Sequence, residues 1–116
     1  VLTYSAFESG SLWLQSEQAW DRIRDDVMAL PNFNARHRSL QRRLVGSATA
    51  VEPDGNGRIL IPPSLRQVAG LEKRVVMLGM GNRFEIWDED TLNTQRAEEV
   101  SNLDAQASAE MESLVL

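Results

Sequence analysis

The nine residues Asp54–Pro62, with the sequence DGNGRILIP, constrain the fold of this 116-residue chain more than any other stretch. Two glycines at the start of the run favour a tight turn, because glycine tolerates the positive φ angles that turns need. The turn leads into an apolar strand and then into prolines that suit the first turn of a helix. Its tip would present backbone N–H groups and the guanidinium of Arg58, a combination that suits phosphate groups and base edges.

The same residues have a second, purely structural interpretation. A DGNG sequence is ordinary hairpin-turn chemistry, in which Asp54 accepts hydrogen bonds from its own backbone and pairs with Arg58 on the surface. Composition alone favours this interpretation, since such turns are common. A calcium loop is excluded, because an EF-hand needs a glutamate at its twelfth position, and this chain has Leu65 there.

The positive charge of the chain is concentrated around this loop. Residues 31–74 carry eight basic and three acidic side chains, whereas residues 1–30 have a net charge of −3 and residues 75–116 a net charge of −7. The overall charge of −5 therefore does not exclude a nucleic-acid partner, because one face can still be basic. On charge alone, the uneven distribution is better explained as a bias between solvated surfaces of the protein.

Several classes of site are absent from the sequence. No cysteine is present, which excludes disulfides and thiolate metal sites. There is no G-x-x-x-x-G-K loop and no G-x-S-x-G motif, and the one histidine, His37, lies among arginines. We therefore predict a protein that is not an enzyme and has no catalytic residues, cofactor or metal site. No apolar run approaches bilayer length, so a soluble intracellular protein without a membrane partner is expected.

Apolar periodicity and turn signals divide the chain into short strands and helices. Strands are predicted at residues 1–7, 12–15, 47–51, 58–61, 74–78 and 83–87. Helices are predicted at residues 17–30, 35–45, 62–69 and 89–100. Ser16, Asn34 and Asp88 are suitable N-caps for three of these helices.

The predicted helix at 35–45 is strongly basic. Its four arginines are Arg36, Arg38, Arg42 and Arg43. Arginines four or seven positions apart share a helix face, so two basic faces are expected. These faces could contact phosphates, or they could pair with acidic segments of this chain or of a neighbouring subunit. The sequence does not decide between these partners.

A weak internal repeat relates the two ends of the chain. Leu12, Leu14, Ser16 and Trp20 precede Phe84, Ile86, Asp88 and Leu92 by the same 72 positions. Each half would therefore end as a strand, an N-cap and a helix.

One region of the sequence resembles a known family closely. The signature consists of DGNGRILIP at 54–62, LR at 65–66, AGL at 69–71, VV at 75–76 and GNRFEIWD at 81–88. Upstream, LWL at 12–14, Trp20 and RRLVG at 42–46 fit the same pattern. The chain thus resembles the MraZ family of transcription regulators, which is related to the AbrB-type swapped-hairpin DNA-binding proteins.

The resemblance implies an α+β fold, namely a pseudo-twofold swapped-hairpin AbrB-like β-barrel with flanking helices. Members of the family carry two D-x-x-x-R half-motifs, and only Asp54–Arg58 is present here, so the first half-motif is expected ahead of Val1. Residues 1–46 would be the remainder of the first half, and residues 47–101 the second half. Residues 102–116 would form a tail that is a marginal helix or disordered.

The resemblance also implies a function. A family member would be a sequence-specific, cytoplasmic and nucleoid-associated regulator of the division and cell-wall gene cluster. It would bind repeated promoter boxes in double-stranded DNA as a ring-shaped homo-oligomer, without a small-molecule substrate. Arg58 would contact DNA, Gly55, Asn56 and Gly57 would lie at the DNA, and Asp54 would hold the loop. The alternative is a swapped-hairpin, antitoxin-like protein-interaction module without direct DNA contact.

Overall fold

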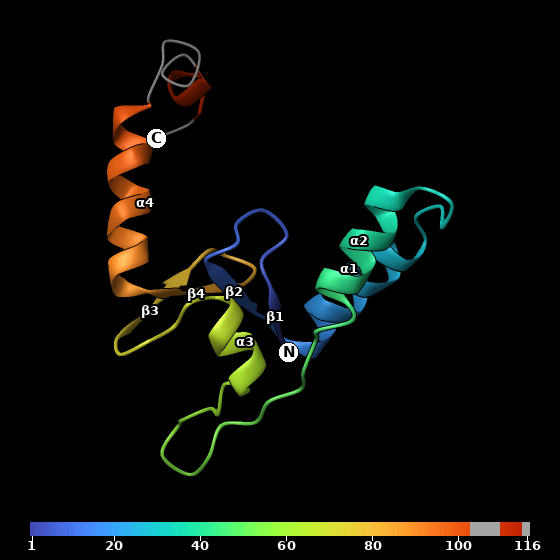
Figure 1. The fold of residues 1–116 in the computed structure, drawn as a ribbon, viewed down its shortest axis with the longest axis horizontal. Helices are drawn as coiled ribbons and strands as arrows, with labels where there is room; N and C mark the ends of the chain where they lie inside the picture. Colours follow the sequence, from blue (N-terminus) through green and yellow to red (C-terminus); the bar gives the residue numbers. More distant parts are fainter. Residues whose placement is uncertain (103–109, 115–116) are drawn as a thin grey trace.

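A computed structural model describes residues 1–102 and 110–114 of the chain (Figure 1). Its strands are β1 (Leu2–Tyr4), β2 (Ser11–Leu14), β3 (Val75–Gly79) and β4 (Phe84–Asp88). They form one antiparallel sheet in the order β1-β2-β4-β3. Four of the predicted strands thus form the antiparallel hairpins β1–β2 and β3–β4, which join through the pairing of β2 with β4.

The four predicted helices are present. They are α1 (Glu17–Met28), α2 (Ala35–Leu44), α3 (Pro63–Val68) and α4 (Glu89–Ser101). The side chains of Ser16, Asn34 and Asp88 accept hydrogen bonds from backbone N–H groups in the first turns of α1, α2 and α4. Each cap satisfies N–H groups that have no partner within the helix, and this local chemistry explains why the helix starts could be predicted.

The contacts of β2 with β4 agree with the internal repeat. Trp13 and Glu85 are 72 residues apart and face each other in the register of these strands. Ser16 and Asp88 have the same separation, and both cap a helix that follows directly on its strand. Each hairpin is therefore followed by a capped helix, and the inner strands of the two hairpins pair with each other.

The main core lies between one face of the sheet and α3. Alternate residues of a strand point to the same face, so Leu12 and Ile86, which are cross-strand partners, both meet the helix side. The buried residues of this core are Leu2, Leu12, Leu65, Ala69, Leu71 and Ile86. Val51 and Ile61 pack against its edge.

Polar contacts organise the other face of the sheet. The indole N–H of Trp87 donates to Glu85 Oε1 over 3.0 Å. The guanidinium carbon of Arg83 lies 4.1 Å from the ring centroid of Trp13. This cation–π contact covers one face of the Trp13 indole, which is buried. The hydroxyl of Thr3, which is fully buried on β1, donates to the carbonyl of Leu44 and joins α2 to the sheet.

Two predicted strands and the closed barrel are not found within the described residues. The segment 47–51 makes only an isolated bridge, in which Thr49 exchanges two backbone hydrogen bonds with Leu2. The segment 58–61 pairs with no strand, and Leu60 is 81% exposed. β-formers adopt a ladder only when a partner strand is available, so the sheet stays open and residues 47–62 form an irregular projection, called here the arm.

The first strand is also shorter than predicted. It ends at Tyr4, because the Ser5 hydroxyl accepts hydrogen bonds from the backbone N–H groups of Phe7 and Glu8 and turns the chain. Phe7 lies in this turn and is 76% exposed.

The helices project from different sides of the sheet. Figure 1 shows the α1–α2 pair on the right, α4 on the left and the arm below. Of the predicted tail at 102–116, residues 103–109 and 115–116 lie outside the described residues, and residues 110–112 form one helical turn. No helix in the described ranges is long and apolar enough to cross a bilayer.

Candidate nucleic-acid interface

The loop at the tip of the arm is held by its own atoms. One carboxylate oxygen of Asp54 accepts hydrogen bonds from the backbone N–H groups of Asn56 (2.8 Å) and Arg58 (3.0 Å). The backbone N–H of Asp54 donates to the carbonyl of Arg58 over 2.8 Å and closes the loop. Gly57 has a φ of 76°, a left-handed conformation that favours glycine. The loop geometry therefore depends on Asp54 and Gly57.

These hydrogen bonds lower the pKa of the Asp54 carboxyl below its ordinary value. The largest cause is the backbone N–H of Arg58, followed by that of Asn56, because both donate to the charged form. A lowered pKa means that the ionised carboxylate stabilises the folded loop above the ordinary carboxyl pKa. This stabilisation is lost as the pH falls through the lowered value.

Acidification is therefore expected to release the loop while the sheet stays folded. The amide resonances of Asn56 and Arg58 should shift together in an NMR titration, with a midpoint below the ordinary aspartate pKa. Asp54→Asn, which keeps an oxygen acceptor but cannot ionise, should abolish the transition at both amides. A midpoint at or above the ordinary value would contradict the hydrogen-bonded loop.

The side chain of Arg58 is free to contact a partner. The residue is exposed, and within residues 1–102 and 110–114 its guanidinium makes no ion pair or side-chain hydrogen bond. Its link to Asp54 is made by the backbone, so the predicted surface pair between the two charged side chains is not formed here. Val51 and Ile61, packed against the core, anchor the two legs of the arm and position its tip.

Gly55 differs from Gly57 in its surroundings. A Cβ at Gly55 would meet no atom within 4 Å, and its φ is not positive. Nothing in the chain itself therefore requires glycine at this position. The missing side chain leaves the backbone at the tip open to close approach, which phosphate-binding loops use.

The basic helix α2 is not brought to this loop. Figure 1 places it at the far end of the molecule from the arm. Arg43 donates to the carbonyls of Ser5 and Glu8, each over 3.1 Å, and lies over the ring of Tyr4. Arg43 is therefore a structural residue that fixes the β1–β2 turn, a role that its sequence neighbours do not indicate.

The remaining arginines of α2 are turned outward. Arg38 donates to the carbonyl of Asn32 over 2.7 Å. Arg36 and Arg42 are exposed, and in the described part of the chain neither pairs with a carboxylate. The predicted pairing of this helix with acidic segments of its own chain is thus not observed among those residues. Phosphates and a neighbouring subunit both remain as partners.

A groove beside Met28 is a further surface feature that the sequence pattern does not indicate. The apolar stripe of α1 consists of Trp20, Ile23 and Val27 at helical spacing and continues to Leu30 just beyond the helix, and Met28 lies off this stripe. The structure shows that this methionine is exposed, and exposed methionines often mark contact surfaces.

Comparisons with known proteins give a consistent result. A family model described as "MraZ protein, putative antitoxin-like" matches residues 44–113. The protein named transcriptional regulator MraZ from Stenotrophomonas maltophilia is 57% identical over 89 residues, which cover 77% of this chain and 60% of that protein. A protein of the same name from Xanthomonas oryzae pv. oryzae is 54% identical over the same shares of both chains.

A third relative aligns along nearly the whole sequence. The transcriptional regulator MraZ of Thioalkalivibrio sulfidiphilus is 48% identical over 117 aligned residues, covering 99% of this chain and 78% of that protein. The match to the Stenotrophomonas and Xanthomonas proteins spans only 60% of their length.

Proposed function

Because the chain belongs to the MraZ family, we propose that it is a sequence-specific DNA-binding transcriptional regulator. The observation that carries the proposal is the loop at 54–58, which is held by its own hydrogen bonds. At the tip of the arm it presents open backbone and the guanidinium of Arg58, which pairs with no side chain of residues 1–102 and 110–114. The regulated target would be the division and cell-wall gene cluster, through repeated boxes in its promoter. The site of action would be the cytoplasm, at the nucleoid.

Each residue of the loop has a proposed role. Arg58 contacts DNA directly, and its planar fork can bind guanine O6 and N7 in the major groove or a phosphate. Gly55, Asn56 and Gly57 bring the backbone close to the DNA. Asp54 does not touch DNA and holds the loop through the two hydrogen bonds that it accepts.

The arm also suits a larger assembly. We propose that the arm, residues 47–62, pairs with the corresponding segment of the other D-x-x-x-R half-motif. This pairing would convert the open sheet into the swapped-hairpin barrel implied by the family. Residues 1–46 then belong to the first half, residues 47–101 to the second, and residues 102–116 to a tail. Copies of the chain form a ring, in which several loops contact successive boxes and gain affinity through effective concentration.

A salt series tests the proposed function. The chain is titrated with duplex DNA that carries the repeated boxes, and with a shuffled duplex of equal length. Each neutralised phosphate contributes about −0.9 to the slope of log affinity against log salt. We expect a steep slope with both duplexes and tighter binding to the boxes at every salt concentration. Equal affinity for the two duplexes would contradict sequence-specific regulation.

The description of the matching family as antitoxin-like favours one second candidate. In that case the loop would be structural, and a protein partner would bind elsewhere on the chain. Isolation of the chain in a stoichiometric complex with another protein, together with the absence of salt-sensitive DNA binding, would identify this function.

A further inference from the structure

We propose that residues 110–114 of one copy bind in the groove between α1 and α2 of the next copy. This inference rests on the ring assembly proposed above and assigns the surfaces that would build it. The contact joins two different parts of the chain, so it can repeat head-to-tail from copy to copy around a ring.

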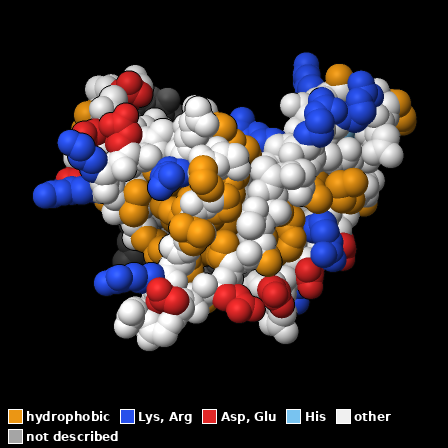
Figure 2. Space-filling view, turned by 60° about the horizontal axis from the view of Figure 1, so that its bottom comes forward, with side chains coloured by type: hydrophobic (Ala, Val, Ile, Leu, Met, Phe, Trp, Pro, Cys, Tyr) orange, Lys and Arg blue, Asp and Glu red, His pale blue; other side chains and the backbone are white. Residues whose placement is uncertain are grey.

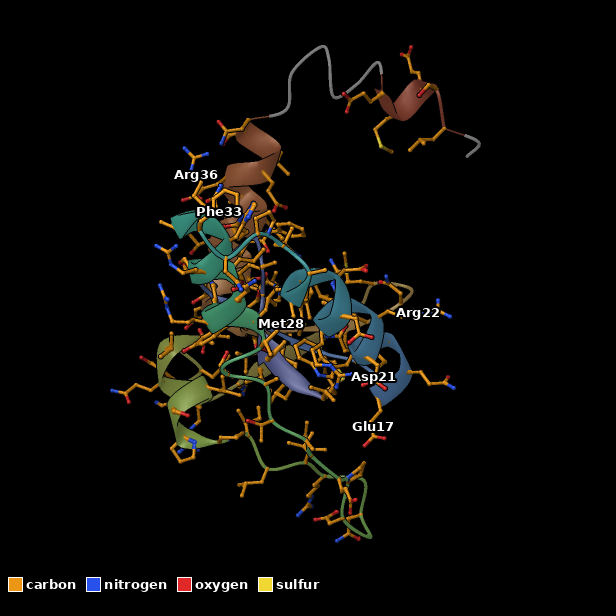
Figure 3. The ribbon with its side chains drawn as sticks, turned by 90° about the vertical axis from the view of Figure 1, so that its right-hand side faces the viewer. Glu17, Asp21, Arg22, Met28, Phe33 and Arg36 are labelled. Atoms are coloured by element: carbon orange, nitrogen blue, oxygen red, sulfur yellow. The ribbon has the colours of Figure 1, made fainter. Side chains whose placement is uncertain are left out.

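The groove is lined by both apolar and basic side chains. It has a volume of about 400 Å³, and its lining includes Met28, Val45, Arg38 and Arg42. Met28 is 49% exposed and lies between the two helices in Figure 3. The side-chain amide of Gln41 donates to the carbonyl of Val27 over 3.2 Å, which fixes α2 against α1 and preserves the shape of the groove.

Residues 110–114 have the complementary chemistry. Glu110, Met111 and Glu112 form a helical turn, and Met111 and Leu114 are 51% and 56% exposed. Apolar residues three positions apart share one side of a helical turn, which is the spacing used by helices that bind in grooves. Glu110 and Glu112 supply the negative charge for Arg38 and Arg42, which pair with no carboxylate in the part of the chain that the structure describes.

The positions of the two surfaces favour a second copy over the same copy. Figure 1 shows α4, which leads to the C-terminal end, on the side of the sheet opposite the α1–α2 pair. Figure 2 shows several Lys and Arg side chains at the upper right, where the α1–α2 pair lies, and both acidic and basic side chains at the left-hand end. When each copy passes its tail to the next copy and not back to the same partner, such a contact closes into a ring.

The charges along the α1–α2 pair indicate which part of it the acidic residues 110–114 would contact. In Figure 3, Glu17 and Asp21 lie at the opposite end of α1 from Met28, whereas Phe33 and Arg36 lie near the tip. Glu17 and Asp21 place negative charge at the far end of α1. Arg38 and Arg42, which line the groove on the α2 side, are the basic residues that an acidic segment in the groove would meet.

A complementation experiment tests the contact. The groove variant is Arg38→Glu/Arg42→Glu, and the tail variant is Glu110→Lys/Glu112→Lys. We expect each variant alone to dissociate at least tenfold more readily than the parent chain in sedimentation velocity runs. An equimolar mixture should regain the parent assembly when the two variants alternate. The acidic tail of the groove variant then meets the basic groove of the tail variant, and the basic tail of the tail variant meets the acidic groove of the groove variant.

A matched control is Arg22→Glu/Arg36→Glu, which reverses two exposed arginines of the same helices outside the groove. It should keep the parent mass. Met111→Ser/Leu114→Ser, at exposed positions, should weaken assembly without a change of charge. A monomeric parent, groove and tail variants of unchanged mass, or a mixture that does not reassemble would overturn the proposal.

DNA binding separates this proposal from the proposed function. A groove variant that loses assembly and still binds a single box through Arg58 supports both proposals. A parent chain that assembles through these surfaces and binds no DNA supports the contact and overturns the regulatory function. Full assembly of the groove variant on DNA overturns the contact alone.

Discussion

Arg58→Ala is expected to weaken binding to a single promoter box by about 1–3 kcal/mol, roughly 5- to 150-fold. The loop has two charged side chains, and Asp54 is used to hold the loop. The guanidinium of Arg58 makes no such contact within the described residues and is available to bind DNA. Loss of a bidentate contact to guanine accounts for a penalty of this size. On repeated boxes the loss should be larger, because several loops contribute to one assembly.

The same substitution should leave the fold intact. Asp54 accepts its hydrogen bonds from the backbone of Arg58, which alanine also provides. The side chain is exposed, and exposed substitutions of this kind usually change stability by less than about 0.5 kcal/mol. Gel-shift titrations at matched salt, together with melting curves, measure both quantities.

Two further variants show which kind of contact is lost. Arg22→Ala removes an arginine on α1, far from the arm, and should retain the affinity of the parent chain. Arg58→Lys keeps the charge and loses the planar fork, so it should bind phosphate and lose the preference for the boxes over shuffled DNA. Equal affinity of Arg58→Ala and the parent chain would remove Arg58 from the interface.

Local chemistry explains what the sequence predicted well. Ser16, Asn34 and Asp88 cap helices because each side chain needs only N–H groups two or three residues away. The loop at 54–58 is likewise closed by hydrogen bonds within five residues. The repeat of 72 residues correctly indicated that both halves end as a strand, an N-cap and a helix, but it did not predict the pairing of β2 with β4.

Long-range contacts explain what the sequence did not predict. The segments 47–51 and 58–61 contain good β-formers, but a strand needs a neighbour, and propensity does not supply one. Arg43 was grouped with the other arginines of α2, although its side chain binds carbonyls 35 and 38 positions away. The exposure of Arg58 could be predicted from its place in a turn. The molecule that its side chain binds could not, because the residues of a loop do not determine which partner approaches it.

Leu12→Ala is expected to cause the largest loss of stability, about 2–5 kcal/mol. Leu12 is fully buried and lies opposite Ile86 in the central pairing of the sheet, beneath Leu65 of α3. Truncation leaves a cavity that β2 and β4 cannot close, since both strands are held by neighbours on either side. In a domain whose total stability is about 5–15 kcal/mol, this is a large fraction.

Urea unfolding followed by tryptophan fluorescence measures the effect, because Trp13, Trp20 and Trp87 are all buried. Phe33→Ala is the control: it removes a larger side chain that is 89% exposed at the tip of the α1–α2 pair, and it should cost less than about 0.5 kcal/mol. A similar loss for both variants would mean that burial in the β2–β4 core does not determine stability. The pairing of β2 with β4, which joins the two hairpins, would then not be a main source of the stability of the fold.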